Sequence, residues 1–220
     1  MIWLNYQSGL LRLFLVNLFR AVVVFFSVYV LLAFMGSDDD LQQISWSVAG
    51  MFVLVVLDSV LPWSLLVATL FTVGPRAHFK ELSALNSVGF SMLQIMWPML
   101  GVGVLATVSS AVLRLSGVLP GGPPLLSTAA EQTAFHAKMA YPLVNLFAVV
   151  AGVILASSPI RKSIYGGFLR ALLFVFAFNV VAGVAQALGR QGVWHPVLAG
   201  WLGSITAAAL LLALWYRARL

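Results

Sequence analysis

The side chains that could carry chemistry are few in this sequence and widely spaced. His78, His136 and His195 stand apart, with no HExxH pair and no carboxylate cluster that would complete a zinc site. None of the three lysines follows a glycine-rich loop of the kind that cradles nucleotide phosphates. Gly203-Ser204 lacks the GxSxG nucleophile elbow. We therefore predict no metal site, no cofactor bound by this chain and no ATP hydrolysis by this route.

A polar segment at residues 75–90, PRAHFKELSALNSVGF, separates two long apolar ones and contains Glu81, one of six acidic residues. Its apolar residues recur at the three-residue spacing of a short amphipathic helix, and they are Phe79, Leu82, Leu85 and, less regularly, Val88. Gly89 would end or bend this helix. Such a helix either lies at the lipid headgroups or docks into a partner that reads the charge of Glu81.

Composition indicates the elements that must position these residues. Hydrophobic residues make up 62% of the 220 residues and charged residues only 8%, against about 25% in soluble domains. A bilayer core needs roughly 20 apolar residues per helical span, and six stretches suffice: 11–35, 46–73, 89–113, 139–157, 168–188 and 195–215. The sequence predicts an all-α integral membrane protein with six spans. The first stretch is too long for a signal peptide, and without cysteine there is no disulfide framework.

The basic residues lie at the ends of the predicted spans rather than in one patch, although the net charge is +6. This distribution sets membrane orientation and excludes nucleic acid as a partner. One set of loops holds Arg76, Lys80, Arg161, Lys162, Arg170, Arg217 and Arg219. The alternate loops hold Asp38, Asp39, Asp40, Arg114, Glu131, Lys138 and Arg190. The bias predicts that both termini and the Glu81 segment are cytoplasmic.

A Gly/Pro-rich run at Pro120–Pro124 divides the chain, because proline lacks the helical donor and glycine adds backbone freedom. We predict a first three-span block over 1–113, an extracytoplasmic loop over 114–138 and a second three-span block over 139–220. The first block includes a short cytoplasmic helix at 76–88, between spans two and three.

Polar and small residues form stripes along three spans, and such stripes mark either contacts between helices or a polar cavity. The stripes are Asn17, Arg20 and Ser27, then Asn145, Ala148 and Gly152, then Asn179, Gly183 and Gln186. Two charges, Arg20 and Asp58, lie at membrane depth, where an ionisable residue is a functional candidate. The long stem of Arg20 also allows its guanidinium to reach the headgroups. Asp58 is too short for that, so we expect it to hydrogen-bond a helix neighbour or to be protonated.

Several segments resemble the LptF/LptG (YjgP/YjgQ) permease family. The segment LPWSLLVATLFTVGPRAHFKELSALNSVGFSMLQI resembles the family's second span and the helix after it, through Leu61-Pro62, Gly74, Glu81-Leu82 and Ser87-Val88-Gly89. KMAYPLVNLFAVVAGVILASSPIRKSIYGG resembles the fourth span and the loop after it. GRQGVWHPVLAGWLGSITAAALLLALWYRAR resembles the last span, with Gly192, Pro196 and Trp201 in place.

The resemblance implies a permease subunit of an ABC-type exporter of lipopolysaccharide or a similar membrane lipid in the bacterial inner membrane. Its expected partners are a second six-span half, identical or homologous, a dimeric LptB-like ATPase that uses ATP and Mg²⁺, and a periplasmic bridge protein. Residues 76–88 would be the coupling helix, with Glu81 in a groove of the ATPase. The coupling site would comprise Arg76, Lys80, Glu81, Leu82 and Leu85. A lipid gate between spans one and five of opposing halves would lie near Asn17, Arg20, Asn179, Gly183 and Gln186.

The loop over 114–138 stands where the family carries a periplasmic β-jellyroll. Asp38, Asp39 and Asp40 stand where the family often places lysines that bind lipid phosphates, so the cargo is either lipopolysaccharide or a different lipid. Two other functions stay open on the sequence: a non-transporting scaffold or regulator with the same frame, and a small solute-binding membrane subunit. Identification of co-purifying proteins and lipids would separate them.

Overall fold

The computed structural model describes residues 2–35, 46–116, 128–157 and 164–218, and nearly all of them are helical. The helices are α1 (Ile2–Met35), α2 (Trp46–His78), α3 (Glu81–Ser87), α4 (Met92–Leu115), α5 (Ala129–Ala140), α6 (Leu143–Ser157), α7 (Ile164–Arg190) and α8 (Pro196–Ala218). Five residue groups named above lie outside the described residues: Asp38–Asp40, Pro120–Pro124, Arg161, Lys162 and Arg219.

The prediction of an all-α protein with six membrane spans agrees with the helices. Within the described residues, α1, α2, α4, α7 and α8 are each long and apolar enough to cross a bilayer. Helices α5 and α6 pass the same test together, as a pair bent by 47°. The described residues thus hold five spans, or six when the bent pair is one broken span, and the short α3 lies between the second and third spans.

The bent span is longer than the sequence predicts. Residues 129–138, assigned above to a loop, form most of α5, which a capping box between Thr128 and Glu131 begins. Because Pro142 has no backbone N–H, the helix breaks after Tyr141 and resumes as α6. Helix α8 approaches α5 closely at Gly200 and so holds it in place. The approach is too close for any side chain at that position, because a Cβ there would lie 2.5 Å from the Cβ of His136.

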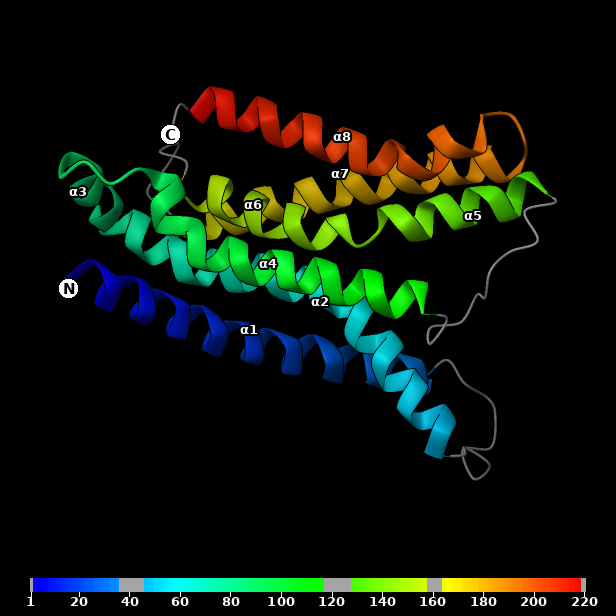
Figure 1. Cartoon of the computed structure of the whole chain (residues 1–220), viewed down its shortest axis with the longest axis horizontal. Coiled ribbons are helices and arrows are strands. Elements are labelled where there is room, and N and C mark those ends of the chain that lie inside the picture. The colour runs from blue at the N-terminus through cyan, green and yellow to red at the C-terminus, as the bar shows by residue number, and fades with distance from the viewer. Residues whose placement is uncertain (1, 36–45, 117–127, 158–163, 219–220) are drawn as a thin grey trace.

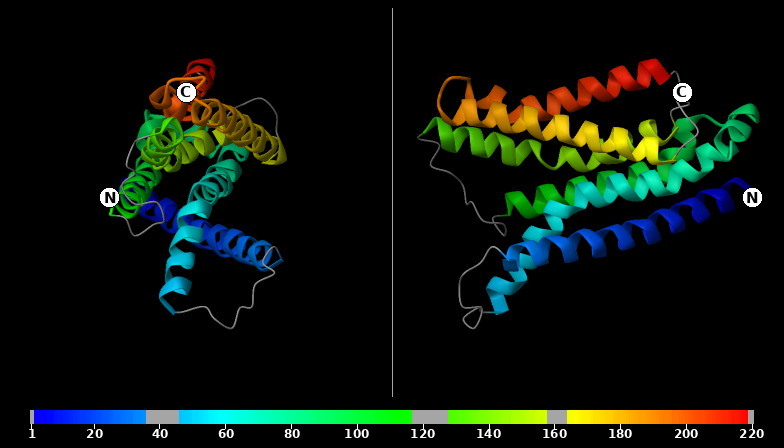
Figure 2. Two further views of the ribbon diagram at one scale, coloured as in Figure 1. Left: turned by 90° about the vertical axis from the view of Figure 1, so that its right-hand side faces the viewer. Right: turned by 180° about the vertical axis from the view of Figure 1, so that it is seen from behind.

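The helices form an elongated bundle, with α1 along one side and α8 along the other (Figure 1). Both α3 and the N-terminal end of α1 lie at one end of the bundle, whereas α5 begins at the opposite end (Figures 1 and 2). In the apolar stretch by which each helix would cross the membrane, 44% of the residues are buried in α2, against 6% in α1 and 11% in α7. Helix α2 is thus central, and α1 and α7 are peripheral.

The contact between α2 and α6 is a close one within the core. A Cβ on Gly152 would lie 2.7 Å from the Cβ of Thr69 and 3.2 Å from the carbonyl oxygen of Leu66. On the same face of α6, Ala148 and Asn145 are buried, and the Asn145 amide donates to the carbonyl of Ala106 in α4 at 3.3 Å. This stripe therefore packs between helices, where small residues let backbones approach closely.

Substitution of Gly152 by alanine tests this contact. The added methyl group must displace Thr69 or the α2 backbone, and overpacking of this kind costs about 1–3 kcal/mol. We expect Gly152→Ala to lower the midpoint of thermal unfolding in detergent. Gly183→Ala is the matched control, because no atom lies within 4 Å of its Cβ position. That change should leave the midpoint equal or raise it through helix propensity. Equal midpoints for both variants would contradict the close contact.

Candidate functional site

The turn between α2 and α3 is the first part of the candidate site. The predicted helix over 76–88 is divided: residues 76–78 end α2, Phe79 and Lys80 form a turn, and α3 begins at Glu81. Lys80 has φ 59°, in the left-handed region, where a residue other than glycine costs roughly 1–2 kcal/mol. At the other end of α3, Gly89 has φ 95°. These two residues set the direction in which α3 leaves the bundle (Figure 1).

Two leucines fix α3 to the rest of the chain. Leu82 is buried in the core cluster, and Leu85 packs against that cluster. Phe79 and Val88, which belong to the same apolar stripe of the sequence, are 69% and 74% exposed. The stripe is therefore divided: Leu82 and Leu85 attach α3 to its own bundle, so the surface left for a partner consists of other residues.

Glu81 and Arg76 form an ion pair across this turn. The Arg76 Nε lies 3.7 Å from Glu81 Oε2, and the Glu81 side chain is 53% exposed. Arg76 also donates from Nη1 to the carbonyl oxygen of Thr72 at 2.7 Å. Lys80 beside them is exposed. Three of the five predicted coupling residues, Arg76, Lys80 and Glu81, thus lie together at the surface of one end of the bundle.

Asn17, which the resemblance places near a gate, joins α1 to α2. Its side-chain amide donates to Thr72 Oγ1 at 3.1 Å, and that hydroxyl donates to the carbonyl of Ala68. Asn17 therefore belongs to the same part of the structure as Arg76, because Thr72 contacts both. Its hydrogen bond accounts for the presence of this asparagine in a largely apolar span.

The remaining predicted gate residues do not meet within this chain. Arg20 is exposed on the outer face of α1, in a shallow groove that Arg12 also lines. On α7, Gly183 is exposed and Gln186 is half-buried. Helices α1 and α7 lie on different sides of the bundle (Figures 1 and 2). A gate formed by these residues would need a second chain.

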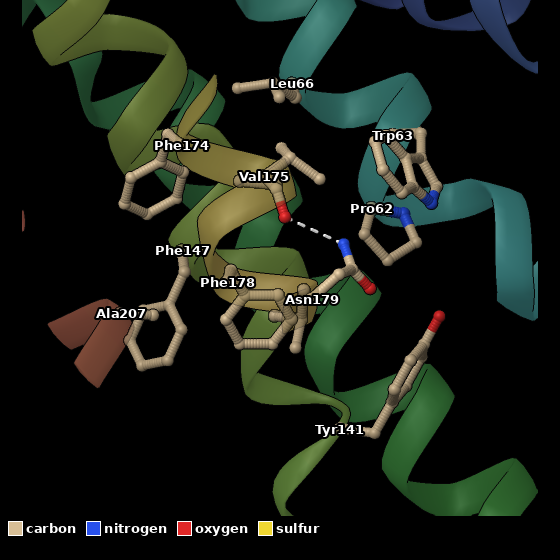
Figure 3. A pocket seen from close by; sticks show the side chains of 12 residues that line it. Pro62, Trp63, Leu66, Tyr141, Phe147, Phe174, Val175, Phe178, Asn179 and Ala207 are labelled. Carbon is tan, nitrogen blue, oxygen red and sulfur yellow. Dashed lines mark hydrogen bonds between the residues drawn. The ribbon is translucent and has the colours of Figure 1, made fainter. Parts of the chain in front are cut away.

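Asn179 of α7 lines a small pocket between α2, α6, α7 and α8 that is partly open to the surroundings. Figure 3 shows Trp63, Phe174 and Phe178 around it, and Asn179 donating to the carbonyl of Val175 in its own helix, at 2.8 Å. Most lining side chains are apolar or aromatic. Such a lining suits hydrocarbon better than a polar solute.

Sequence reasoning missed a buried ion pair between α2 and α4. Asp58, with its side chain 2% exposed, pairs with Arg114 and accepts a hydrogen bond from the Ser110 hydroxyl. The Arg114 Cζ lies 3.8 Å from the ring centroid of Tyr141, a cation–π distance. Arg114, assigned above to an outer loop, is in the last turn of α4. Two residues of α4 thus satisfy Asp58: Arg114 pairs with its charge, and Ser110 donates a hydrogen bond to it.

A proline helps to place Asp58. Pro62 lies within α2, four residues after Asp58, so the Asp58 carbonyl loses its helical donor. Figure 1 shows the first turns of α2 leaning away from the rest of the bundle. Prolines are a common cause of such bends. Tyr141, whose ring stacks on Arg114, also has its hydroxyl 3.5 Å from the carbonyl oxygen of Ser59. The two proline-disrupted spans, α2 and α5–α6, therefore meet at the ion pair.

These features define a class: a multi-span helical membrane protein whose membrane-depth acid, Asp58, is paired with an arginine of a neighbouring helix. Among the described residues, no group of three or more His, Cys, Asp or Glu side chains could hold a metal ion. The family model described as "Lipopolysaccharide export system permease LptF/LptG" matches residues 9–121 and 121–217. The chain belongs to the LptF/LptG permease family. A comparison with curated proteins gave no match.

Family membership confirms the resemblance and defines the general activity. The chain is a permease of the ABC transporter that exports lipopolysaccharide. In this family the permeases are transmembrane subunits, and ATP hydrolysis resides in LptB. Association within that transporter follows from membership, and the prediction that this chain is not itself the ATPase agrees with it.

Disruption of the Asp58–Arg114 pair should destabilise the protein strongly. Asp58→Asn leaves the Arg114 charge partly buried without its partner, and breaking one side of a buried pair costs about 3–5 kcal/mol. We expect a clearly lower unfolding midpoint in detergent. The double variant Asp58→Asn/Arg114→Gln should lose less than the sum of the two single variants, because each single change leaves a charge behind. Strict additivity in this double-mutant cycle would show that the pair contributes nothing as a pair.

Proposed function

We propose that α3 is the docking helix for an LptB-like ATPase dimer and that Glu81 is the charge that the ATPase recognises. The observation that carries this proposal is the division of α3 into an attached face and a free face. Leu82 is 7% exposed, whereas the Glu81 side chain is 53% exposed. A helix attached by buried leucines and offering one acidic side chain can transmit force from a partner that binds that side chain.

Helix α2 is the route by which this force would enter the membrane. It runs from the turn at Phe79 and Lys80 to beyond Asp58, and it is the most buried of the five unbroken candidate spans. Because its contact with α6 is tight at Gly152, the two helices would move as one body. ATPase closure would then act by rigid-body motion of spans.

The proposal includes an orientation and a second permease half. Docking to an ATPase requires α3 and both termini on the cytoplasmic side of a bacterial inner membrane. An arginine at membrane depth is costly unless it faces a polar environment, and Arg20 is exposed on α1. A second six-span half, identical or homologous, that faces α1 and α7 would enclose Arg20, Asn179 and Gln186 in a shared lipid path.

The cargo in this proposal is a membrane lipid of the lipopolysaccharide type, and the apolar pocket beside Asn179 suits its hydrocarbon chains. The two matched segments meet at Gly121, within the run between α4 and α5. That run covers only residues 116–128, far fewer than the roughly 100 residues of an independent domain. A partner chain would therefore make the contact with a periplasmic bridge protein.

Substitution of Glu81 by glutamine tests the docking proposal. The change keeps the size of the side chain and removes its charge, so the fold should persist while one charge-assisted hydrogen bond to the ATPase is lost. We expect about tenfold weaker ATPase binding, measured on the chain purified in mild detergent with its co-purifying ATPase. Lipid transport should fall in parallel.

The matched control is Glu131→Gln, which removes one acidic charge at the opposite end of the bundle. Glutamine also serves in a capping box, so α5 should keep its N-terminal cap. This variant should bind the ATPase like the wild type. Full binding and full transport by Glu81→Gln would overturn the assignment of Glu81.

The orientation can be measured directly because the chain contains no cysteine. We expect a single cysteine at Phe79, which is 69% exposed, to react with a membrane-impermeant maleimide only from the cytoplasmic side. A cysteine at Gln191, exposed in the turn after α7, should react only from the outside. Both should react after detergent solubilisation. The reverse pattern in intact cells and inverted vesicles would refute the cytoplasmic docking site.

A further inference from the structure

The contacts of Arg76 with α2 and with α3 differ sharply in quality. Its Nη1 is 2.7 Å from the Thr72 carbonyl oxygen, a normal hydrogen bond within α2. Its Nε is 3.7 Å from Glu81 Oε2, which is within ion-pair range but too long for a hydrogen bond. Arg76 is therefore held firmly to α2 and only loosely to α3.

The two partners also differ in their exposure to solvent. The Arg76 side chain is 20% exposed, whereas the Glu81 side chain is 53% exposed. Ion pairs this open to water contribute little, because water and salt screen the attraction. Glu81 can therefore leave Arg76 at low cost, while Arg76 stays in place through its bond to Thr72.

The fixed end of this contact is also joined to α1. Thr72 accepts the hydrogen bond from Asn17, and Tyr6 lies close enough to Arg76 and Glu81 for their charges to act on its hydroxyl. Gln7 of α1 donates to the carbonyl of Gln94 in α4 at 3.2 Å. The guanidinium of Arg76 thus lies where α1, α2 and α3 meet.

We propose that Arg76 is an intramolecular competitor for Glu81: it holds this carboxylate while α3 is free and releases it to a cationic side chain of the ATPase on docking. The inference rests on the proposed docking function of α3 and adds its regulation. Arg76 is a positioning residue here, since it acts on the ATPase only through Glu81.

The exchange would also free α3 to pivot. With Glu81 bound to the ATPase, the links of α3 to the bundle are its leucines and the turns at its two ends, at Lys80 and at Gly89. Lys80 is the one residue other than glycine with positive φ among the described residues. A left-handed residue at a turn stores backbone strain, so this is the point at which a change in the direction of α3 costs least.

The test is a double-mutant cycle on ATPase affinity, with the full chain in nanodiscs and the ATPase that co-purifies with the wild type as the probe. Arg76→Gln removes the competitor and keeps an N–H donor for Thr72. We expect it to bind the ATPase about two- to fivefold more tightly, the range that an exposed ion pair supplies. In the Glu81→Gln background, the same change at Arg76 should have no effect on affinity, because the carboxylate it competes for is gone.

Arg190→Gln is the control, because it removes the same charge at the end of α7, remote from α3. It should leave the affinity unchanged. The competition would be overturned if Arg76→Gln bound the ATPase no more tightly than the wild type. It would also be overturned if Arg76→Gln raised the affinity equally with Glu81 present and with Glu81 replaced by glutamine. If the wild-type chain captures no ATPase at all, the docking function itself is wrong and the competition falls with it, so the two failures are distinguishable.

Discussion

The cost of an unpaired charge in hydrocarbon is the constraint on which this structure depends. An isolated carboxylate or guanidinium at membrane depth is expensive, and within the described residues Asp58 satisfies the constraint through Arg114 and Ser110. To do so, α2 and α4 must lie side by side at that level, and Tyr141 must bring the α5–α6 break against them. One acidic residue thus fixes the relation of three spans. Glu81, whose ion pair is exposed, lies instead at one end of the bundle.

Helix α2 combines these requirements in one element. It carries Asp58 in its first half, and in its second half it receives Gly152 of α6 against Thr69, while Thr72 and Arg76 beyond that contact bind α1 and α3. Each contact has a different physical basis. The first is a buried charge, the second is the absence of a side chain at a glycine, and the third is a series of hydrogen bonds. Since all three act on one helix, a displacement at its α3 end would, under the docking proposal, be passed on to these contacts.

Length and hydropathy predicted the spans because a bilayer needs a run of apolar residues whatever the tertiary contacts are. They did not reveal α5, although its capping box, Thr128 with Glu131, is a local signal that the preceding glycines and prolines obscured. Spacing identified the stripe of Leu82 and Leu85, but spacing alone does not say whether a stripe faces its own bundle or a partner. The pairing of Asp58 with Arg114, far apart in sequence, needed the fold.

The two ends of the bundle resist motion unequally. At one end, a buried ion pair supported by Ser110 and the Tyr141 ring would leave an uncompensated charge if it opened, so its rearrangement is costly. At the other end, the exposed ion pair between Arg76 and Glu81, at 3.7 Å, can open at little cost. The backbone at Lys80, which is left-handed, can change its conformation there as well. Under the docking proposal, a force applied at α3 would therefore move that end first, while the Asp58–Arg114 pair would stay closed and act as the pivot. The distribution of charge that suits the bundle to lipid would then also determine where it bends.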